Sequence, residues 1–225
     1  MKAVRISSNI LAAAIVALCV TLHASTVAAQ AYTYPSMQLP TVSNRDFTGA
    51  LSVAKGTVAV FQWREGLSDV MHFSLDAGLG DPEGRNNELV VFGGGGLGYQ
   101  LLRATGDQPL DLLLTGGAGV ALGAGQTVVR LPVGASAGHR FGFEGGLALT
   151  PYAHPRLSID RCFSCNGSTT NSTEVSLNFD VGVNFEVTPR FSLRAAAAFS
   201  GSDVVSRNDT FAFGINWIPA PLVKK

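Results

Sequence analysis

The sequence predicts an all-β protein: a closed antiparallel up-and-down transmembrane β-barrel that follows a cleaved signal peptide. Three observations lead to this fold class. The N-terminal segment has the layout of a secretory signal, and the rest of the chain is a series of segments in which apolar and polar residues alternate. Charged residues make up only 14% of the chain, whereas soluble domains carry about 25%.

Residues 1–29 form the predicted signal peptide. Lys2 and Arg5 precede the apolar run ILAAAIVALCV, and the small residues of STVAA predict cleavage after Ala29. A retained transmembrane anchor is the alternative. Cys19 belongs to the discarded segment, because the bulky Leu18 precedes it where a lipoprotein site needs a small residue. No run of about 18 apolar residues follows the signal, so a mature membrane protein would have to cross with strands.

Residues 30–46 predict an extended N-terminal arm, because they contain two prolines and little periodicity. Turn signals then divide residues 47–217 into segments typical of strands. Short connections lie between several of them, and longer polar loops between others, as in outer-membrane barrels. The residues 218–225 form a tail, and eight strands are the alternative to ten. The ten predicted strands cover 47–54, 57–64, 70–80, 88–102, 109–122, 127–138, 142–154, 174–187, 191–201 and 209–217.

The segment EVSLNFDVGVNFEV at 174–187 indicates which side of the sheet faces lipid. Val175 and Leu177 lie on one face of this strand, and Asn178 and Asp180 lie on the other. A soluble β-sandwich would carry many Lys and Glu on its outer face. The polar positions here hold mostly Gly, Ala, Ser and Asn. The apolar faces contain no charge, which would cost about 2–4 kcal/mol at the middle of a bilayer. We therefore predict that the acids point into a lumen.

The charges on the predicted inner faces nearly balance in sign. A selective pore would show one dominant sign, so we predict a paired polar network that fills a narrow lumen. A small-solute channel is the second possibility, because inward glycines such as Gly117, Gly119, Gly134 and Gly182 enlarge the space. The predicted lumen network consists of His72, Asp76, Asp111, Arg130, Glu144, Asp180 and Arg194, with Arg64, Arg156 and Glu186 on the same faces.

One group of residues invites a catalytic interpretation. His72, Ser74 and Asp76 share a strand face, but alternate residues on a strand lie about 7 Å apart. A catalytic imidazole has to reach both the hydroxyl and the carboxylate, which this spacing disfavours. No sequence signal joins His154 to Asp180. The sequence predicts no enzyme activity and no cofactor, and a lipid-modifying barrel enzyme is the least favoured alternative.

Two further motifs have simple interpretations. Cys162 and Cys165, in CFSC, are predicted to form a disulfide in an oxidising envelope. No second cysteine pair completes a zinc site, and the context of a thioredoxin motif is lacking, so no metal is predicted. GGGGLG at 93–98 is not followed by the lysine or the helix pattern of a phosphate loop.

The signal peptide, the alternating segments and the terminal TFAFGINW resemble those of small outer-membrane β-barrel proteins of Gram-negative bacteria, the opacity-protein and porin-like group. The resemblance covers residues 47–217. It implies the cell outer membrane as location, contact with its lipid, and recognition of the last strand, which ends on Trp217, by the barrel-assembly machinery. The zero net charge excludes the basic footprint of a nucleic-acid binder. We expect a structural or surface-interaction role in the envelope, with a narrow passive channel as the alternative.

Overall fold

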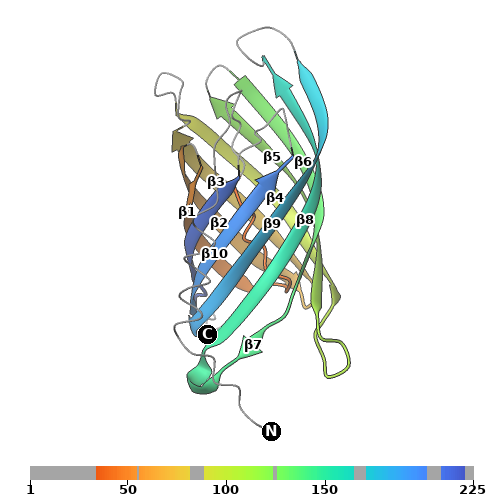
Figure 1. Ribbon diagram of the computed structural model, residues 1–225, viewed down its shortest axis with the longest axis vertical. Coiled ribbons are helices and arrows are strands. Elements are labelled where there is room, and N and C mark those ends of the chain that lie inside the picture. Colours follow the sequence, from red (N-terminus) through yellow and green to blue (C-terminus); the bar gives the residue numbers. More distant parts are fainter. Residues whose placement is uncertain are drawn as a thin grey trace, which may run out of the picture.

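The protein is a closed antiparallel β-barrel (Figure 1). The computed structural model describes residues 34–54, 56–81, 89–123, 126–164, 171–201 and 209–220. The sheet closes because β1 pairs with β11 and β6 pairs with β8, which confirms the predicted barrel of ten long strands. The elements are β1 Arg45–Val53, β2 Thr57–Ser68, β3 Met71–Asp81, β4 Val90–Leu102, β5 Asp111–Gly123, β6 Gln126–Gly138, β7 Phe141–Gly142, the 3₁₀ helix η1 Glu144–Gly146, β8 Ala148–Phe163, β9 Ser172–Thr188, β10 Phe191–Ser200 and β11 Thr210–Trp217.

The largest departure from the predicted strands lies in β8. The sequence predicts a strand that ends at His154, before a long loop, whereas β8 continues to Phe163. The polar stretch after Pro155 keeps the alternation of a strand, with Leu157 exposed outside and Asp160 buried inside. The high content of Ser, Asp and Arg hid this strand, because polar residues are typical both of loops and of a barrel's inner face.

The segment before β8 departs from the prediction in the opposite direction. The predicted strand begins at Gly142, but only Phe141–Gly142 pairs there, with Leu149 and Ala148. The 3₁₀ helix Glu144–Gly146 follows, and Gly145 has a φ of 81°, a left-handed conformation that only glycine adopts easily. This backbone conformation interrupts the strand, which resumes at Ala148.

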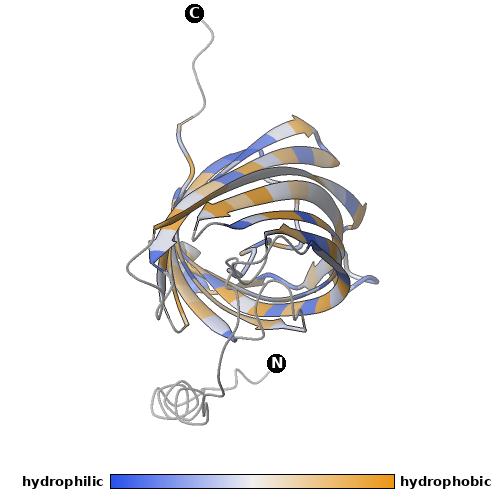
Figure 2. Cartoon of the chain, turned by 90° about the horizontal axis from the view of Figure 1, so that it is seen from above, coloured by the Kyte–Doolittle hydropathy of each residue, from blue (hydrophilic) through white to orange (hydrophobic). Residues whose placement is uncertain are grey.

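The barrel is polar inside and apolar outside. Val175 and Phe213 on the outer face are 69% and 66% exposed, whereas Arg64 and Asn178 on the inner face are each 1% exposed. Figure 2 shows hydrophobic and hydrophilic residues alternating along the ribbons. Such a distribution suits lipid around the barrel and reverses the usual order of a soluble protein. No helix among the described residues has the length and apolarity needed to cross a membrane.

A row of aromatic rings lies on the outside of β11, β1, β2 and β3. Trp217 stacks on Phe47 with ring centroids 5.8 Å apart, and Phe47 stacks on Trp63 at 6.4 Å. Trp63 contacts Phe73 edge to face at 5.2 Å. The row lies toward the end of the barrel where β1 begins and β11 ends. Aromatic residues at this level are typical of the girdles that barrels place at the membrane interface.

Candidate functional site

The described part of the predicted arm, residues 34–44, lies inside the barrel. The backbone N–H of Ser36 donates to Asp180 of β9 at 3.1 Å. On β6, the Ser136 hydroxyl donates to the carbonyl of Gln38 at 2.7 Å. These contacts come from separate strands of the wall, so the segment occupies the lumen rather than its rim. The sequence predicts the arm but not its position, because nothing in residues 30–46 distinguishes a lumen segment from a solvated one.

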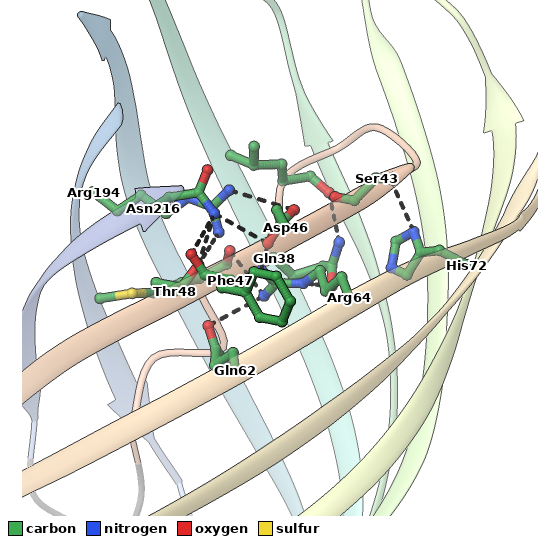
Figure 3. Close-up of polar contacts among 12 residues, drawn as sticks. Gln38, Ser43, Asp46, Phe47, Thr48, Gln62, Arg64, His72, Arg194 and Asn216 are labelled. Carbon is green, nitrogen blue, oxygen red and sulfur yellow. Dashed lines mark hydrogen bonds and ion pairs between the residues drawn. The ribbon is translucent and has the colours of Figure 1, made fainter. Parts of the chain in front are cut away.

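Arg64 of β2 is the main contact between the arm and the wall (Figure 3). Its Nε donates to Gln38 Oε1 at 3.2 Å, and its Nη2 donates to the carbonyls of Ser36 and Met37 at 3.1 and 3.2 Å. Its Nη1 pairs with Asp46 at 3.4 Å. Met37 has a φ of 48°, uncommon for a residue with a side chain. The bonds from Arg64 hold the carbonyls on either side of this bend.

Asp46 joins the arm contacts to a second group of buried side chains (Figure 3). Arg194 Nη2 lies 3.8 Å from its carboxylate, and Asn216 Nδ2 donates to it at 3.1 Å. Arg194 also donates to Thr48 Oγ1 at 2.8 Å and to Asn184 Oδ1 at 3.1 Å. Arg194 was predicted in the lumen network. Asp46 was not, because it stands at the boundary between the predicted arm and the first strand.

Asp180 and His154 form the opposite attachment of the arm. Asp180 accepts from Arg156 Nη2 at 2.8 Å, and the Ser36 hydroxyl lies 2.7 Å from His154 Nδ1. Thr115 Oγ1 lies 2.9 Å from His154 Nε2. A hydroxyl, an imidazole and a carboxylate therefore meet here, as in a nucleophilic triad. The carboxylate is 3.6 Å from Nδ1, however, beyond hydrogen-bond reach. The hydrogen-bond partner of His154 Nδ1 is instead the Ser36 hydroxyl of the arm.

Arg130 has a partner that the sequence analysis missed. Its Nε and Nη2 donate to Asp160 at 2.6 and 2.9 Å, a bidentate pair of the strong kind. Ser158 and Ser176 also donate to this carboxylate, at 3.2 and 2.8 Å. Asp160 was placed in the predicted loop, and only the continued alternation of RLSIDRCF could have moved it into the wall.

The remaining predicted lumen residues have local partners. His72 is buried, and its Nδ1 accepts from the backbone N–H of Ser43 at 3.3 Å. Asp76 accepts from the hydroxyl of Tyr34 at 3.3 Å. Both therefore contact the arm rather than assembling with Ser74. Asp111 is buried at the start of β5, where its Oδ1 accepts from the backbone N–H of Ala104 in the preceding turn.

Two predicted acids lie away from the packed interior. Glu144 was expected in the lumen, but it is exposed in the 3₁₀ helix, because the strand begins only at Ala148. Glu186 lies near the end of β9 and pairs with the largely exposed Arg140 at 2.7 Å. Hydrogen bonding to Glu186 raises the pKa of the Arg140 guanidinium.

Cys162 is buried at the loop end of β8 and is disulfide-bonded. Cys165 lies outside the described residues, so the pairing of these two cysteines stays a prediction. Among the residues that the structure describes, no group of three or more His, Cys, Asp or Glu side chains is placed to hold a metal ion.

A cavity of about 150 Å³ remains in the lumen between the arm and strands β4 and β5. Tyr34, Ser36 and Gln38 line the arm side. The wall side is made of glycines, and in the register of β4 and β5 Gly94 lies opposite Gly119 and Gly96 opposite Gly117. Of the glycines predicted to enlarge the lumen, Gly117 and Gly119 line this cavity, whereas Gly134 lies against Arg156 and Gly182 lies against the Tyr152 ring. The remaining polar lining comes from Arg64, Ser74, Asp76, Thr115, Arg130, His154 and Arg156.

No protein-family model and no curated protein matches the sequence. Among solved structures, a bacterial polysaccharide outer membrane secretin is similar at 7% identity and a TM-score of 0.48, over 80% of this chain and 67% of that chain. The β domain of the Bordetella autotransporter BrkA is similar at 10% identity and 0.48, over 77% and 97%. The KdgM porin follows at 6% identity and 0.40, over 78% and 99%. Similarity at this level carries no information on activity.

Proposed function

We propose that this chain is an outer-membrane β-barrel with a structural or surface-interaction role in the bacterial envelope, and that its own N-terminal arm plugs the lumen. The position of residues 34–44 carries the proposal. Arg64, Asp180 and Ser136 bind this segment from different strands. Solute would have to pass a segment that is hydrogen-bonded to buried side chains of the wall.

The polarity of the barrel supports the membrane part of the proposal. The outer face carries exposed apolar side chains, and the aromatic row lies toward one end. The predicted signal peptide would send the chain across the inner membrane, and the barrel-assembly machinery and outer-membrane lipid are the partners that such a barrel needs.

A non-enzymatic role is part of this proposal. The one arrangement of hydroxyl, imidazole and carboxylate that we identify among the described residues is centred on His154, and its Nδ1 faces the arm's Ser36 hydroxyl. His154 is 2% exposed. These contacts support a role for His154 in holding the arm rather than in activating a nucleophile.

Conductance across a planar bilayer tests the proposal. The mature chain should give only small, infrequent openings, and a variant that begins at Ser43 should conduct steadily, because the arm is missing from its lumen. The shift in gel mobility on boiling, which reports a folded barrel, should be present in both proteins. Steady conductance of the intact chain would contradict the plugged state.

A narrow passive channel is the second candidate function. The cavity of about 150 Å³ beside the arm favours it, because this part of the lumen is not filled by side chains. In that case the intact chain should conduct, and removal of the arm should raise the conductance only moderately. The two candidates therefore differ in the behaviour of the intact protein.

A further inference from the structure

The cavity beside the arm contains charged groups with unused hydrogen-bonding capacity. Within the described part of the chain, the buried side-chain atoms without a hydrogen-bond partner include Arg156 Nε and Asp76 Oδ1, and both residues line this cavity. A buried polar atom left unpaired destabilises the folded protein. Arg156 and Asp76 thus bring opposite charges to one cavity, where a ligand that carries both charges would pair with the two side chains.

The cationic side of the cavity is suited to a carboxylate. Arg156 uses Nη2 for Asp180, which leaves its buried Nε unpaired. Arg130 uses Nε and Nη2 for Asp160, so its Nη1 is not part of that pair. Guanidinium N–H groups bind carboxylates with short, charge-assisted hydrogen bonds. The Asp160 and Asp180 partners hold both arginines in place and so preorganise this side.

The anionic side is suited to an ammonium group. Asp76 receives the Tyr34 hydroxyl on Oδ2 at 3.3 Å, a long bond that leaves the carboxylate capacity for a further donor. An ammonium group at this carboxylate would gain a charge-assisted bond, whereas a second carboxylate would be repelled. Tyr34 is fixed by stacking on Phe92, with ring centroids 4.9 Å apart.

The cavity has room for a small ligand. A cavity of about 150 Å³ accommodates a molecule of about six non-hydrogen atoms, the size of benzene. Gly119 leaves part of this space open, because a Cβ built there would meet no atom closer than 3.5 Å. A small amino acid, with about this number of non-hydrogen atoms, fits the space.

We propose that the lumen cavity between the arm and the glycine wall, formed by Gly94, Gly96, Gly117 and Gly119 of β4 and β5, binds a small zwitterion of the α-amino-acid class. Its carboxylate meets Arg156 and Arg130, its ammonium group meets Asp76, and its short side chain lies against the glycines of β4 and β5. This inference goes beyond the proposed function and does not depend on whether the lumen conducts.

The direct test is calorimetric titration of the refolded mature chain in detergent with three small molecules. L-Alanine carries both charges, propionate lacks the ammonium group, and ethylamine lacks the carboxylate. Alanine should bind with an affinity at least about tenfold higher than either, because each of the other two molecules lacks one of the two charge-assisted bonds. Binding of propionate as tightly as alanine, or no binding of alanine, would overturn the proposal.

Two glycine variants locate the binding. Gly119→Leu places a side chain in the cavity and should abolish alanine binding. Gly116→Leu is the matched control on the same strand; its Cβ would contact only Val133, on the outer face, at 3.8 Å, so binding should not change. Equal binding by the Gly119→Leu protein would place the alanine elsewhere and overturn the assignment.

Asp76→Asn tests the role of the carboxylate. The variant should bind alanine no more tightly than the wild-type protein binds propionate, and its affinity for propionate should not fall. Unchanged preference for alanine would contradict the role of Asp76. If the Asp76→Asn protein does not refold, the comparison of the three ligands on the wild-type protein still decides the proposal.

Discussion

The two sides of the lumen are built in opposite ways. Along β8, β9 and β10 the wall carries charged and amide side chains that pair with one another or with the arm, as Asp180 does with Arg156 and Ser36. In the middle of β4 and β5 the inner face carries only glycines, and Gly94 and Gly96 lie opposite Gly119 and Gly117. A narrow lumen is thus filled by side chains on one side and left open on the other, and the cavity lies on the open side.

The glycine wall is not uniformly open. A Cβ built on Gly117 would lie 2.6 Å from the carbonyl oxygen of Gly95, and one on Gly94 would lie 2.8 Å from that of Ala118. Neither glycine has a left-handed φ, so close approach of the two strands, and not backbone conformation, requires them. Gly119 is the exception, with 3.5 Å to the nearest atom. On β5, therefore, the closely packed Gly117 is followed two residues later by Gly119, which has free space beside it.

The largest expected effect concerns the paired wall. Asp180→Asn leaves the buried Arg156 without its anionic partner and weakens the attachment of Ser36. Breaking a buried ion pair in this way costs about 3–5 kcal/mol. We therefore expect a large fall in the free energy of unfolding, measured by urea denaturation of the refolded barrel and followed by the gel-mobility shift.

Glu186→Gln is the matched control for this change. It lies on the same strand and also removes a carboxylate from an arginine, but Arg140 is 53% exposed. Exposed pairs contribute about 0–1 kcal/mol, so its effect should be small. Equal losses in the two variants would show that burial does not distinguish these two positions on β9.

The sequence predicts the barrel well because alternation is a local property. Leu157 and Asp160 carry the same alternation as Val175 and Asn178, and only their polar surroundings led to a predicted loop. Glu144 was misplaced because consecutive glycines after it carry no information about which face a residue occupies. In both cases the error lies at an element boundary.

The partners inside the lumen were less predictable. Arg130 and Asp160 pair across β6 and β8, which are adjacent because the barrel closes around the short β7. The arm contacts join Ser36 to His154, which is far from it in the sequence. No periodicity reports such contacts, since they depend on which strands become neighbours and on where the arm lies in the lumen.

The second prediction compares two glycines of the open wall. Gly117→Ala forces β5 away from β4, because its Cβ would meet a backbone oxygen, and overpacking of this kind costs about 1–3 kcal/mol. The new Cβ of Gly119→Ala would have no close neighbour, so this change should be neutral. It could also stabilise the protein by up to about 1 kcal/mol, because alanine lowers the conformational entropy of the unfolded chain. Urea midpoints of the two proteins provide the measurement. Similar losses at both positions would mean that the wall is closely packed throughout.

The smallest expected effect concerns the arm where it borders the cavity. Tyr34→Phe keeps the ring that stacks on Phe92 and removes only the hydroxyl that donates to Asp76. The bond is long, at 3.3 Å, so its loss should lower the free energy of unfolding by about 1 kcal/mol. Tyr99→Phe is the control, because Tyr99 is 49% exposed on the outer face, and it should leave stability unchanged. If Tyr34→Phe has no effect while removal of the arm destabilises the barrel, the arm is held by Arg64 and Asp180 on the paired side alone. The open side would then contribute space for a ligand and nothing to the attachment of the arm.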